Sequence, residues 1–406
     1  MRFLNDYRDI VGDKVISDII KAARPLYGKR VIHINSTFYG GGVAEMLTSL
    51  VPLMNDVGLD AGWRIIRGAP EFFSITKKFH NALQGDEIHL TDIKKRLYKE
   101  INEDFAYYTH INHDAVVIHD PQPLPLINFY KKRQPWIWRG HIDLSHPNPE
   151  LWKFLTNFIL KYDVTIVSHE KYKNDLPMEY KIIHPAIDPL SNKNHDMSAT
   201  EIREHLEKFQ VPNEKPMITQ ISRFDKWKDP LGVLEIYKLV KKEVDCRLIL
   251  CGSMAPDDPE GIEIYQEVQQ RAANLIESGD VTLLTLESNF LVNALQRASS
   301  VVIQKSLREG FGLTVTEAMW KKTPVVASNV GGIPLQIQDG ENGYLAEPDD
   351  IRGFADRVIH LLKNPDKAGK IGERAHESVR QNFLITRILQ DYLDLFNDLL
   401  VAKNGR

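Results

Sequence analysis

The sequence predicts an α/β protein built from two doubly wound parallel-sheet domains. Short apolar runs typical of buried strands alternate with longer, charge-rich segments of helical periodicity. That alternation is typical of parallel sheets covered by helices on both faces. It stops at a polar stretch near residues 190–198 and then starts again. The chain has 406 residues, more than one ordinary core accommodates, so two domains of roughly 150–200 residues are expected.

Eleven runs are candidate strands. Those of the first half are 30–34, 63–66, 115–118, 136–138, 164–167 and 180–183, and those of the second half are 216–221, 246–250, 281–284, 301–303 and 325–327. Helical periodicity is expected over residues 1–28, 43–57 and 388–400. In the first of these segments the apolar face would contain Ile10, Val11, Val15, Ile16 and Ile19.

These elements predict an N-terminal domain over residues 1–190, a second domain over 191–380 and a C-terminal helix over 381–406. The boundary lies in a stretch from Leu190 to Ser198 that has no periodicity and is interpreted as a linker. Two such domains would form a ligand cleft between the carboxyl ends of their strands, which is where α/β proteins bind ligands.

Composition excludes several classes of function. The 51 basic and 55 acidic residues give a net charge of −4, so the chain has no general attraction to nucleic acid. No apolar run approaches the ~20 residues of a membrane span, and the first residues do not resemble a signal peptide, so a cytoplasmic protein is expected. The two cysteines, Cys246 and Cys251, would face opposite sides of one strand and remain reduced. No metal site is predicted, since Asp257 and Asp258 are interpreted as an exposed loop pair.

The most informative motif runs from Glu309 to Glu317, two carboxylates with Gly310-Phe311-Gly312 between them. It follows a candidate strand and opens a candidate helix. A glycine turn that opens a helix is an anion site, because free N–H groups and the helix dipole point toward the ligand. Carboxylates beside an anion would repel it, so these two are expected to accept hydrogen bonds from hydroxyls. Phosphates together with hydroxyls indicate a sugar nucleotide, although the carboxylate spacing alone also occurs by chance.

Two further groups are compatible with this interpretation and do not establish it. Arg223 and Lys228 follow the first strand of the second half and could bind one diphosphate, or they could belong to a solvated basic turn. In the first half, Gly40-Gly41-Gly42 lies between a strand and a helix without matching the dinucleotide fingerprint.

A histidine in the first half is a third candidate. His141 follows a strand and could donate to a sugar hydroxyl or play a structural role. The pair His119-Asp120 closes another strand and could line the same cleft, whereas His33 is expected in the core.

Taken together, these residues resemble the large family 4 of retaining glycosyltransferases, which includes sucrose and trehalose synthases and has the two-domain GT-B fold. The resemblance covers nearly the whole chain. It rests on Gly40–Gly42, Arg139-Gly140-His141, Arg223 with Lys228, the Glu309–Glu317 element and Gly343-Tyr-Leu345, which occur in matching order. Overall likeness is greatest to members that join the glucose of ADP-glucose or UDP-glucose to free glucose, forming trehalose.

The resemblance implies a role for each candidate residue. Arg223 and Lys228 would bind the donor diphosphate, and Glu317 would accept hydrogen bonds from the ribose. Glu309 would lie at the donor hexose, near the backbone N–H groups of the turn. The residues implied as catalytic are therefore Glu309, His141, Arg223 and Lys228, and those implied as substrate-binding are Gly41, Gly42, Arg223, Lys228, Glu309, Gly310, Phe311, Gly312, Leu313 and Glu317.

The same resemblance implies a reversible transfer with retention of configuration and no protein-bound cofactor. Mg²⁺ is expected at most as a companion of the nucleotide diphosphate. The expected partners are a nucleoside diphosphate glucose, glucose and trehalose, without nucleic acid or membrane, and a homodimer remains open. The alternatives are a related glycosyltransferase with another acceptor and a trehalose phosphorylase. A nucleotide-sugar-binding protein without activity and a dehydrogenase fit the residues less well.

Overall fold

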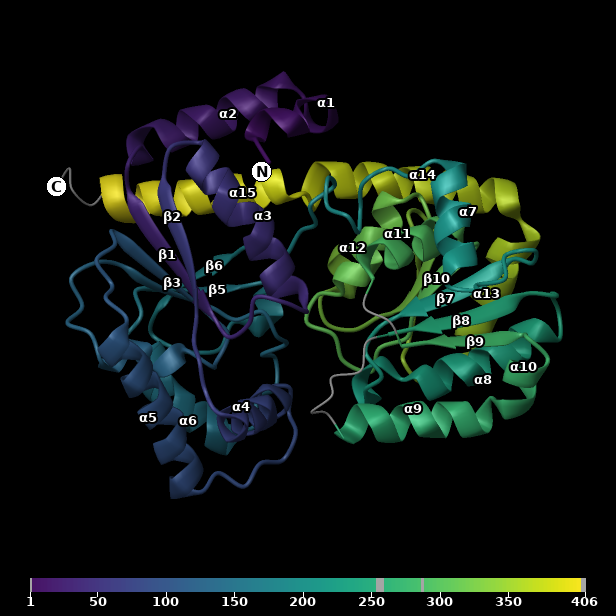
Figure 1. Ribbon diagram of the computed structural model, residues 1–406, viewed down its shortest axis with the longest axis horizontal. Coiled ribbons are helices and arrows are strands. Elements are labelled where there is room, and N and C mark those ends of the chain that lie inside the picture. Colours follow the sequence, from purple (N-terminus) through teal and green to yellow (C-terminus); the bar gives the residue numbers. More distant parts are fainter. Residues whose placement is uncertain (1, 253–258, 286–287, 403–406) are drawn as a thin grey trace. The chain divides into compact units, whose positions relative to one another are not determined.

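The computed structural model describes residues 2–252, 259–285 and 288–402, so the pair Asp257 and Asp258 lies outside the described residues. The chain divides into two compact units. Unit 1 contains residues 1–186 and 385–406, and unit 2 contains residues 187–384. Figure 1 shows that each unit is a sheet with helices on both of its faces. Within the described residues, no helix is both long and apolar enough to span a membrane.

The sheet of unit 1 has six strands, all parallel, in the order β2-β1-β3-β4-β5-β6. Their bounds are β1 (Arg30–Asn35), β2 (Asp60–Ile65), β3 (Ala115–His119), β4 (Trp136–Arg139), β5 (Val164–Val167) and β6 (Glu179–Ile182). Four of them, β1, β3, β4 and β5, are almost entirely buried, which explains why they appear in the sequence as continuous apolar runs.

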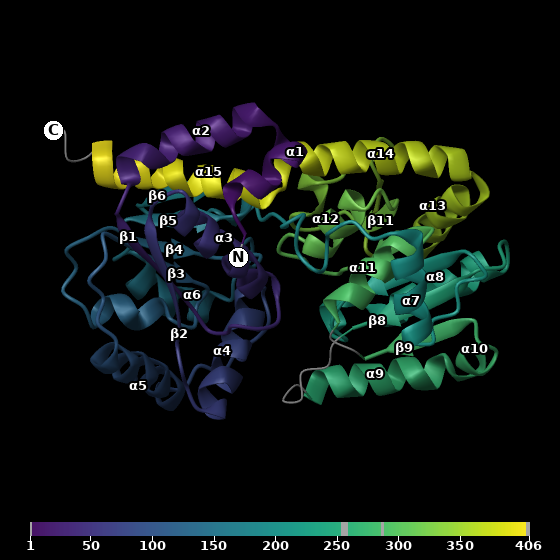
Figure 2. The ribbon, with the colours of Figure 1, turned by 45° about the horizontal axis from the view of Figure 1, so that its top comes forward.

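Helices cover both faces of this sheet (Figures 1 and 2). One face carries α2 (Asp13–Ala23), α3 (Gly42–Asp56) and α15 (Ile385–Phe396), and the other carries α4 (Pro70–Leu83), α5 (Asp92–Tyr108) and α6 (Pro149–Ile159). The core against α4 to α6 contains alternate strand residues, among them Ile32, Val116 and Trp138. The intervening residues, such as His33, therefore face α15.

Unit 2 also has a six-stranded parallel sheet, in the order β12-β11-β10-β7-β8-β9. Its strands are β7 (Met217–Ile221), β8 (Arg247–Cys251), β9 (Val281–Leu284), β10 (Val301–Gln304), β11 (Val325–Ser328) and β12 (Tyr344–Ala346). Its helices are α7 (Ala199–Lys208), α8 (Pro230–Lys241), α9 (Pro259–Arg271), α10 (Ala273–Glu277), α11 (Asn289–Ala298), α12 (Leu313–Trp320), α13 (Ile351–Lys363) and α14 (Pro365–Asn382).

The strand orders identify where each unit should bind a ligand. In unit 2 the order is that of the doubly wound dinucleotide-binding fold, and the chain changes direction between β7 and β10. In unit 1 the change of direction lies between β1 and β3. Ligands of such sheets bind beyond the carboxyl ends of the strands at these points. The predicted α/β class with two doubly wound parallel sheets is confirmed.

Three local expectations differ from the structure. The helix expected over residues 1–28 is divided at Gly12, whose φ of 84° ends α1 (Arg8–Val11) before α2 begins, and Val15 is exposed. The last strand, β12, was not expected as a strand. The stretch 190–198 is not a free linker, because Asn194 is buried and its carbonyl accepts from Trp320 Nε1 at 3.1 Å.

Candidate functional site

Two loops of unit 2 meet at the point where its sheet changes direction. The first loop follows β7 and contains the short 3-10 helix Lys226–Lys228, and the second joins β10 to α12. Their main chains are joined by a hydrogen bond from Leu307 N to Trp227 O at 2.8 Å. The guanidinium of Arg308 also lies 5.5 Å from the centre of the Trp227 ring. The loops therefore form one structural unit, although they are far apart in sequence.

An ion pair between the loops joins two of the predicted site residues. Lys228 Nζ lies 2.5 Å from Glu309 Oε2, and both side chains are largely buried. The same carboxylate oxygen accepts from Gln304 Nε2 at 3.3 Å and from Ser306 Oγ at 3.4 Å. Three donors on one oxygen fix the Glu309 carboxylate in position.

A second ion pair lies beside the first. Lys305 Nζ contacts Asp229 Oδ2, and the Lys305 side chain is only 2% exposed. Asp229 also caps α8, because its other oxygen accepts from Gly232 N at 2.9 Å. A Cβ at Gly232 would lie 2.6 Å from Lys305 Cε, so the absence of a side chain at this position makes room for the pair. Neither Lys305 nor Asp229 was among the residues predicted from the sequence.

The turn from Gly310 to Gly312 leads directly into α12. Gly312 is the N-cap of this helix, has a φ of 87° and supplies no side chain to cap it. The carbonyl of Phe311 accepts from Gln336 Nε2 at 2.6 Å, which fixes the turn from behind. The first N–H groups of a helix have no acceptor within the helix, so the start of α12, which includes Leu313, can bind an anion.

Replacing Gly312 by alanine should destabilise the protein by about 1–2 kcal/mol, because residues with a Cβ disfavour the left-handed region. The new Cβ would also lie 3.3 Å from Glu309 Cγ and from Ile333 Cγ1, so we expect Glu309 to be displaced and activity to fall. Chemical denaturation and steady-state kinetics measure the two effects.

The matched control for that variant is Gly369→Ala in α14, where a Cβ meets no atom within 4 Å. Alanine favours a helix over glycine by about 1 kcal/mol, so this variant should be slightly more stable. Equal stability of Gly312→Ala and the wild type would show that the left-handed turn is not required.

The other two predicted residues of unit 2 do not join the Lys228–Glu309 pair directly. Arg223 is 57% exposed, and its Nη2 lies 3.4 Å from Asp225 Oδ2. Arg223 is linked to Lys228 indirectly, through Asp225, because Asp225 Oδ1 accepts a hydrogen bond from the backbone N–H of Lys228. Glu317 is on α12 and is only 4% exposed, with Lys193 Nζ at 3.5 Å. Lys193 belongs to the polar stretch that the sequence suggested was a linker.

In unit 1 the glycine loop after β1 precedes α3, as predicted. Gly40 and Gly41 have φ of 72° and 82°, and a Cβ at either position would meet no atom within 4 Å. These glycines are therefore required by the backbone conformation and not by packing, and the space beside them is open. Gly42 is the first residue of α3. Tyr39, in the same loop, is 88% exposed.

His141 follows β4 and is half-buried, and its backbone N–H donates to Asp120 Oδ1 at 2.8 Å. Asp120 follows β3 with a φ of 61°, and burial raises the pKa of its carboxyl to about 7. The imidazole of His141 lies 2.9 Å from that of His119, between Nε2 and Nδ1. His119 and His141 are therefore in direct contact within this unit, which the sequence did not reveal.

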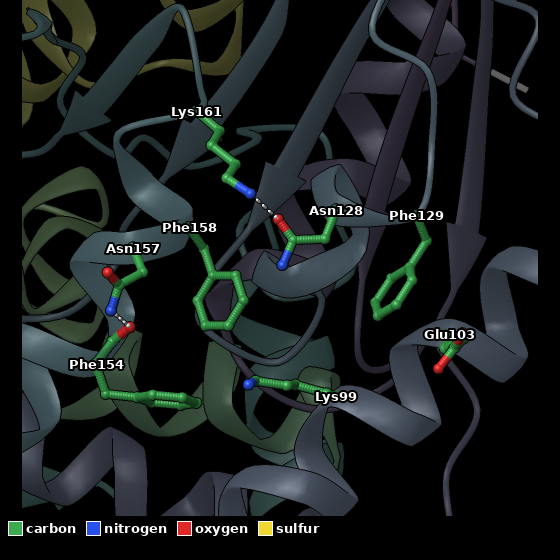
Figure 3. A pocket seen from close by; sticks show the side chains of 8 residues that line it. All are labelled: Lys99, Glu103, Asn128, Phe129, Phe154, Asn157, Phe158 and Lys161. Carbon is green, nitrogen blue, oxygen red and sulfur yellow. Dashed lines mark hydrogen bonds between the residues drawn. The ribbon is translucent and has the colours of Figure 1, made fainter.

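Two surface pockets lie away from these residues. Figure 3 shows one of about 370 Å³ on unit 1, where Lys161 Nζ contacts Asn128 Oδ1 at 2.7 Å. Its remaining lining residues are Lys99, Glu103, Phe129, Phe154, Asn157 and Phe158. A second pocket, of about 480 Å³, lies beside α8. Neither pocket is lined by any of the residues predicted for the site.

Comparison with known proteins covers both units. Residues 33–174 match the family model "Trehalose synthase, N-terminal domain", and residues 201–378 match "Glycosyl transferases group 1". Over 399 residues the chain is 50% identical to the trehalose synthase of Thermococcus litoralis, which covers 97% of this chain and 96% of the relative. It is 31% identical to the trehalose phosphorylase of Grifola frondosa, over 93% of this chain and 58% of that protein.

Solved structures support the same fold at low sequence identity. The Anabaena protein HepE in complex with UDP and glucose superimposes with a TM-score of 0.69 and 17% identity, covering 91% of this chain and all of that one. The similarity extends over both units, and at this identity it concerns the fold alone.

Proposed function

Because the chain belongs to the trehalose synthase family of glycosyltransferases, we propose that it transfers glucose from a nucleoside diphosphate glucose to free glucose. The product would be α,α-trehalose and the reaction would be reversible. The observation that carries the proposal is the Lys228–Glu309 pair at the start of α12. The pair combines a cation with a helix start, and both of these suit a diphosphate. It also contains a carboxylate, which suits a sugar hydroxyl.

We assign the donor to the β7–β10 edge of unit 2. The diphosphate would be held by Lys228, by Arg223 and by the N–H groups at the start of α12. The hexose would donate a hydroxyl hydrogen bond to Glu309, and the ribose would donate to Glu317. Arg223 suits the diphosphate because its exposed guanidinium can form two parallel hydrogen bonds to phosphate oxygens.

For unit 1 we propose that His141 contacts the transferred sugar and that Gly41 and Gly42 allow close approach of the backbone. Both proposed roles are supported by the family resemblance, and that of the glycines also by the open space beside the loop. The loop follows β1, at the point where this sheet changes direction, and His141 follows β4, the neighbour of β3 in the same sheet.

The proposed chemistry retains configuration at the donor carbon. The bond between the anomeric carbon and the diphosphate oxygen breaks as that carbon gains oxocarbenium character. The hydroxyl oxygen of the acceptor glucose attacks from the same face, and its proton passes to the departing phosphate oxygen. Lys228, Arg223 and the helix start stabilise the negative charge that develops on the nucleoside diphosphate. No carboxylate is required as a covalent nucleophile.

Product identification tests the proposal. The protein is incubated with ADP-glucose or UDP-glucose and unlabelled glucose, and the disaccharide is identified by NMR. We expect a symmetric α,α-1,1 linkage and release of one nucleoside diphosphate per disaccharide. No disaccharide, or a β linkage, would refute the proposal. Boiled protein and a reaction without acceptor serve as controls.

A trehalose phosphorylase is the second candidate, and the 31% identity to the Grifola frondosa enzyme favours it. In that reaction inorganic phosphate would replace the nucleoside diphosphate at the same anion site. Incubation of trehalose with phosphate or with a nucleoside diphosphate separates the two. Glucose phosphate would indicate the phosphorylase, and a nucleoside diphosphate glucose would indicate the synthase.

A further inference from the structure

Three histidine side chains form a hydrogen-bonded row across unit 1, and His141 is at its outer end. Nδ1 of His33 lies 3.0 Å from Nε2 of His119, and Nδ1 of His119 lies 2.9 Å from Nε2 of His141. The rings are nearly parallel, at 28° and 20°. His33 and His119 are fully buried.

The register of the sheet produces this row. His33 on β1 is paired with Val117 on β3, and His119 is paired with Arg139 on β4. Each histidine is thus two positions further toward the carboxyl edge than the partner of the previous one. Two positions keep side chains on the same face, so the three imidazoles lie on one diagonal.

The surroundings keep all three rings neutral. Arg139 faces them from β4 and donates to the Tyr392 hydroxyl of α15 at 2.9 Å, and the Tyr392 ring packs edge-on against His33. Asp120 follows β3. Burial, together with the positive charge of Arg139, lowers the pKa of His119 and of His141 well below the usual range and that of His33 to about 3. Each ring therefore carries a single N–H.

A row of neutral imidazoles can be hydrogen-bonded in only two directions. If each ring is protonated on Nδ1, the bonds run from His33 toward His141. If each is protonated on Nε2, they run the other way, and Nε2 of His33 becomes a donor. That atom is buried and has no hydrogen-bond partner in the described part of the chain. An unpartnered buried N–H is less tolerable than an unpartnered lone pair, so protonation on Nδ1 is favoured.

We propose that His33 and His119 are positioning residues that fix the ring and tautomer of His141, so that His141 presents Nδ1–H as a donor to the sugar. This inference rests on the proposed function for the identity of the ligand. A donor from Nδ1 can bind a hydroxyl oxygen of the transferred hexose, whereas an Nε2–H tautomer would offer an acceptor there. The arrangement resembles the way a buried partner orients a catalytic or metal-binding histidine.

Nitrogen NMR of the full-length protein, labelled with ¹⁵N-histidine, tests the tautomer directly. Two-bond proton–nitrogen correlations distinguish Nδ1–H from Nε2–H in neutral imidazoles. We expect the Nδ1–H pattern for His33, His119 and His141, and the Nε2–H pattern for these rings would overturn the inference. The measurement needs no substrate, so its outcome is separate from that of the transfer assay.

Two substitutions at one position test the link to catalysis. His119→Leu should shift His141 to the Nε2–H tautomer that a solvated ring favours and lower kcat by about 10- to 100-fold. The KM for the donor nucleotide should change little. His119→Asn places an amide N–H near the position of Nδ1 and should recover most of kcat together with the Nδ1–H tautomer of His141.

The matched control is Val117→Ala, which alters packing on the same face of β3 without removing an imidazole. It should leave the tautomer of His141 and kcat unchanged. If His119→Leu retains wild-type kcat, or if His119→Asn fails to restore it while thermal denaturation shows a folded protein, the positioning role is refuted.

Discussion

Replacing Lys228 by alanine is expected to lower kcat about 10²- to 10³-fold, the usual effect of removing one donor that stabilises developing negative charge. Lys228 is expected to have this effect because its ammonium is held at the start of α12 by Glu309, at 2.5 Å, and does not sample many positions in solvent. In the proposed reaction that ammonium faces the departing diphosphate. Its removal also leaves the largely buried Glu309 carboxylate without its cation.

Steady-state kinetics with a nucleoside diphosphate glucose, together with calorimetric binding of the nucleoside diphosphate, measures the effect. The matched control is Lys226→Ala, because Lys226 belongs to the same 3-10 helix but is exposed, with its ammonium 4.7 Å from the Trp227 ring centre. This control should retain wild-type turnover. A similar loss in both variants would mean that general positive charge, and not the position of Lys228, matters.

The largest effect on stability is expected for Lys305→Met, which should reduce the free energy of unfolding by about 3–5 kcal/mol. The substitution keeps most of the volume of the side chain but leaves Asp229 without its partner. Asp229 cannot turn toward solvent without losing its cap on α8, where it accepts from Gly232 N. The pair is therefore costly to break even though its formation need not be strongly stabilising.

Urea denaturation of the single variants Lys305→Met and Asp229→Asn and of the double variant apportions the effect. The double variant should be more stable than the sum of the two losses indicates, because no buried charge remains unpaired. Lys238→Met is the control, since its pair with Glu235 is exposed on α8 and should be worth less than about 1 kcal/mol. Equal losses for Lys305→Met and Lys238→Met would contradict the interpretation.

Much of the fold could be predicted because a parallel sheet buries both faces of its strands. Strands such as β3 and β10 are buried along their whole length and appear in the sequence as uninterrupted apolar runs. The strand β12 could not be predicted in this way, because it has three residues, two of them only half-buried, beside a turn. The break at Gly12 was missed because apolar periodicity continues across it and hides the change of backbone conformation.

Site residues could be predicted only where their position depends on nearby residues in the sequence. The Gly310–Gly312 turn and Lys228 lie in the loops that follow β10 and β7, so their place at the carboxyl edge of the sheet could be expected from the sequence. The pairing of Lys305 with Asp229 depends on which strands are neighbours, and β7 and β10 are adjacent only because of the sheet order. The histidine row depends on strand register, which a single sequence does not specify when strands are buried on both faces. The sequence showed only that His119 and His141 lie at strand ends and that His33 lies inside a strand.

The contact between Arg139 and Tyr392 joins residues 253 positions apart, and both belong to unit 1. Unit 2 is thus an insertion between two portions of unit 1. On the ribosome, all of unit 2 is synthesised before the segment that supplies α15. Unit 1 therefore remains incomplete until α15 has been synthesised. Until then one face of its sheet is covered by α2 and α3 but not by α15, and a chain shortened before Ile385 would never complete that cover.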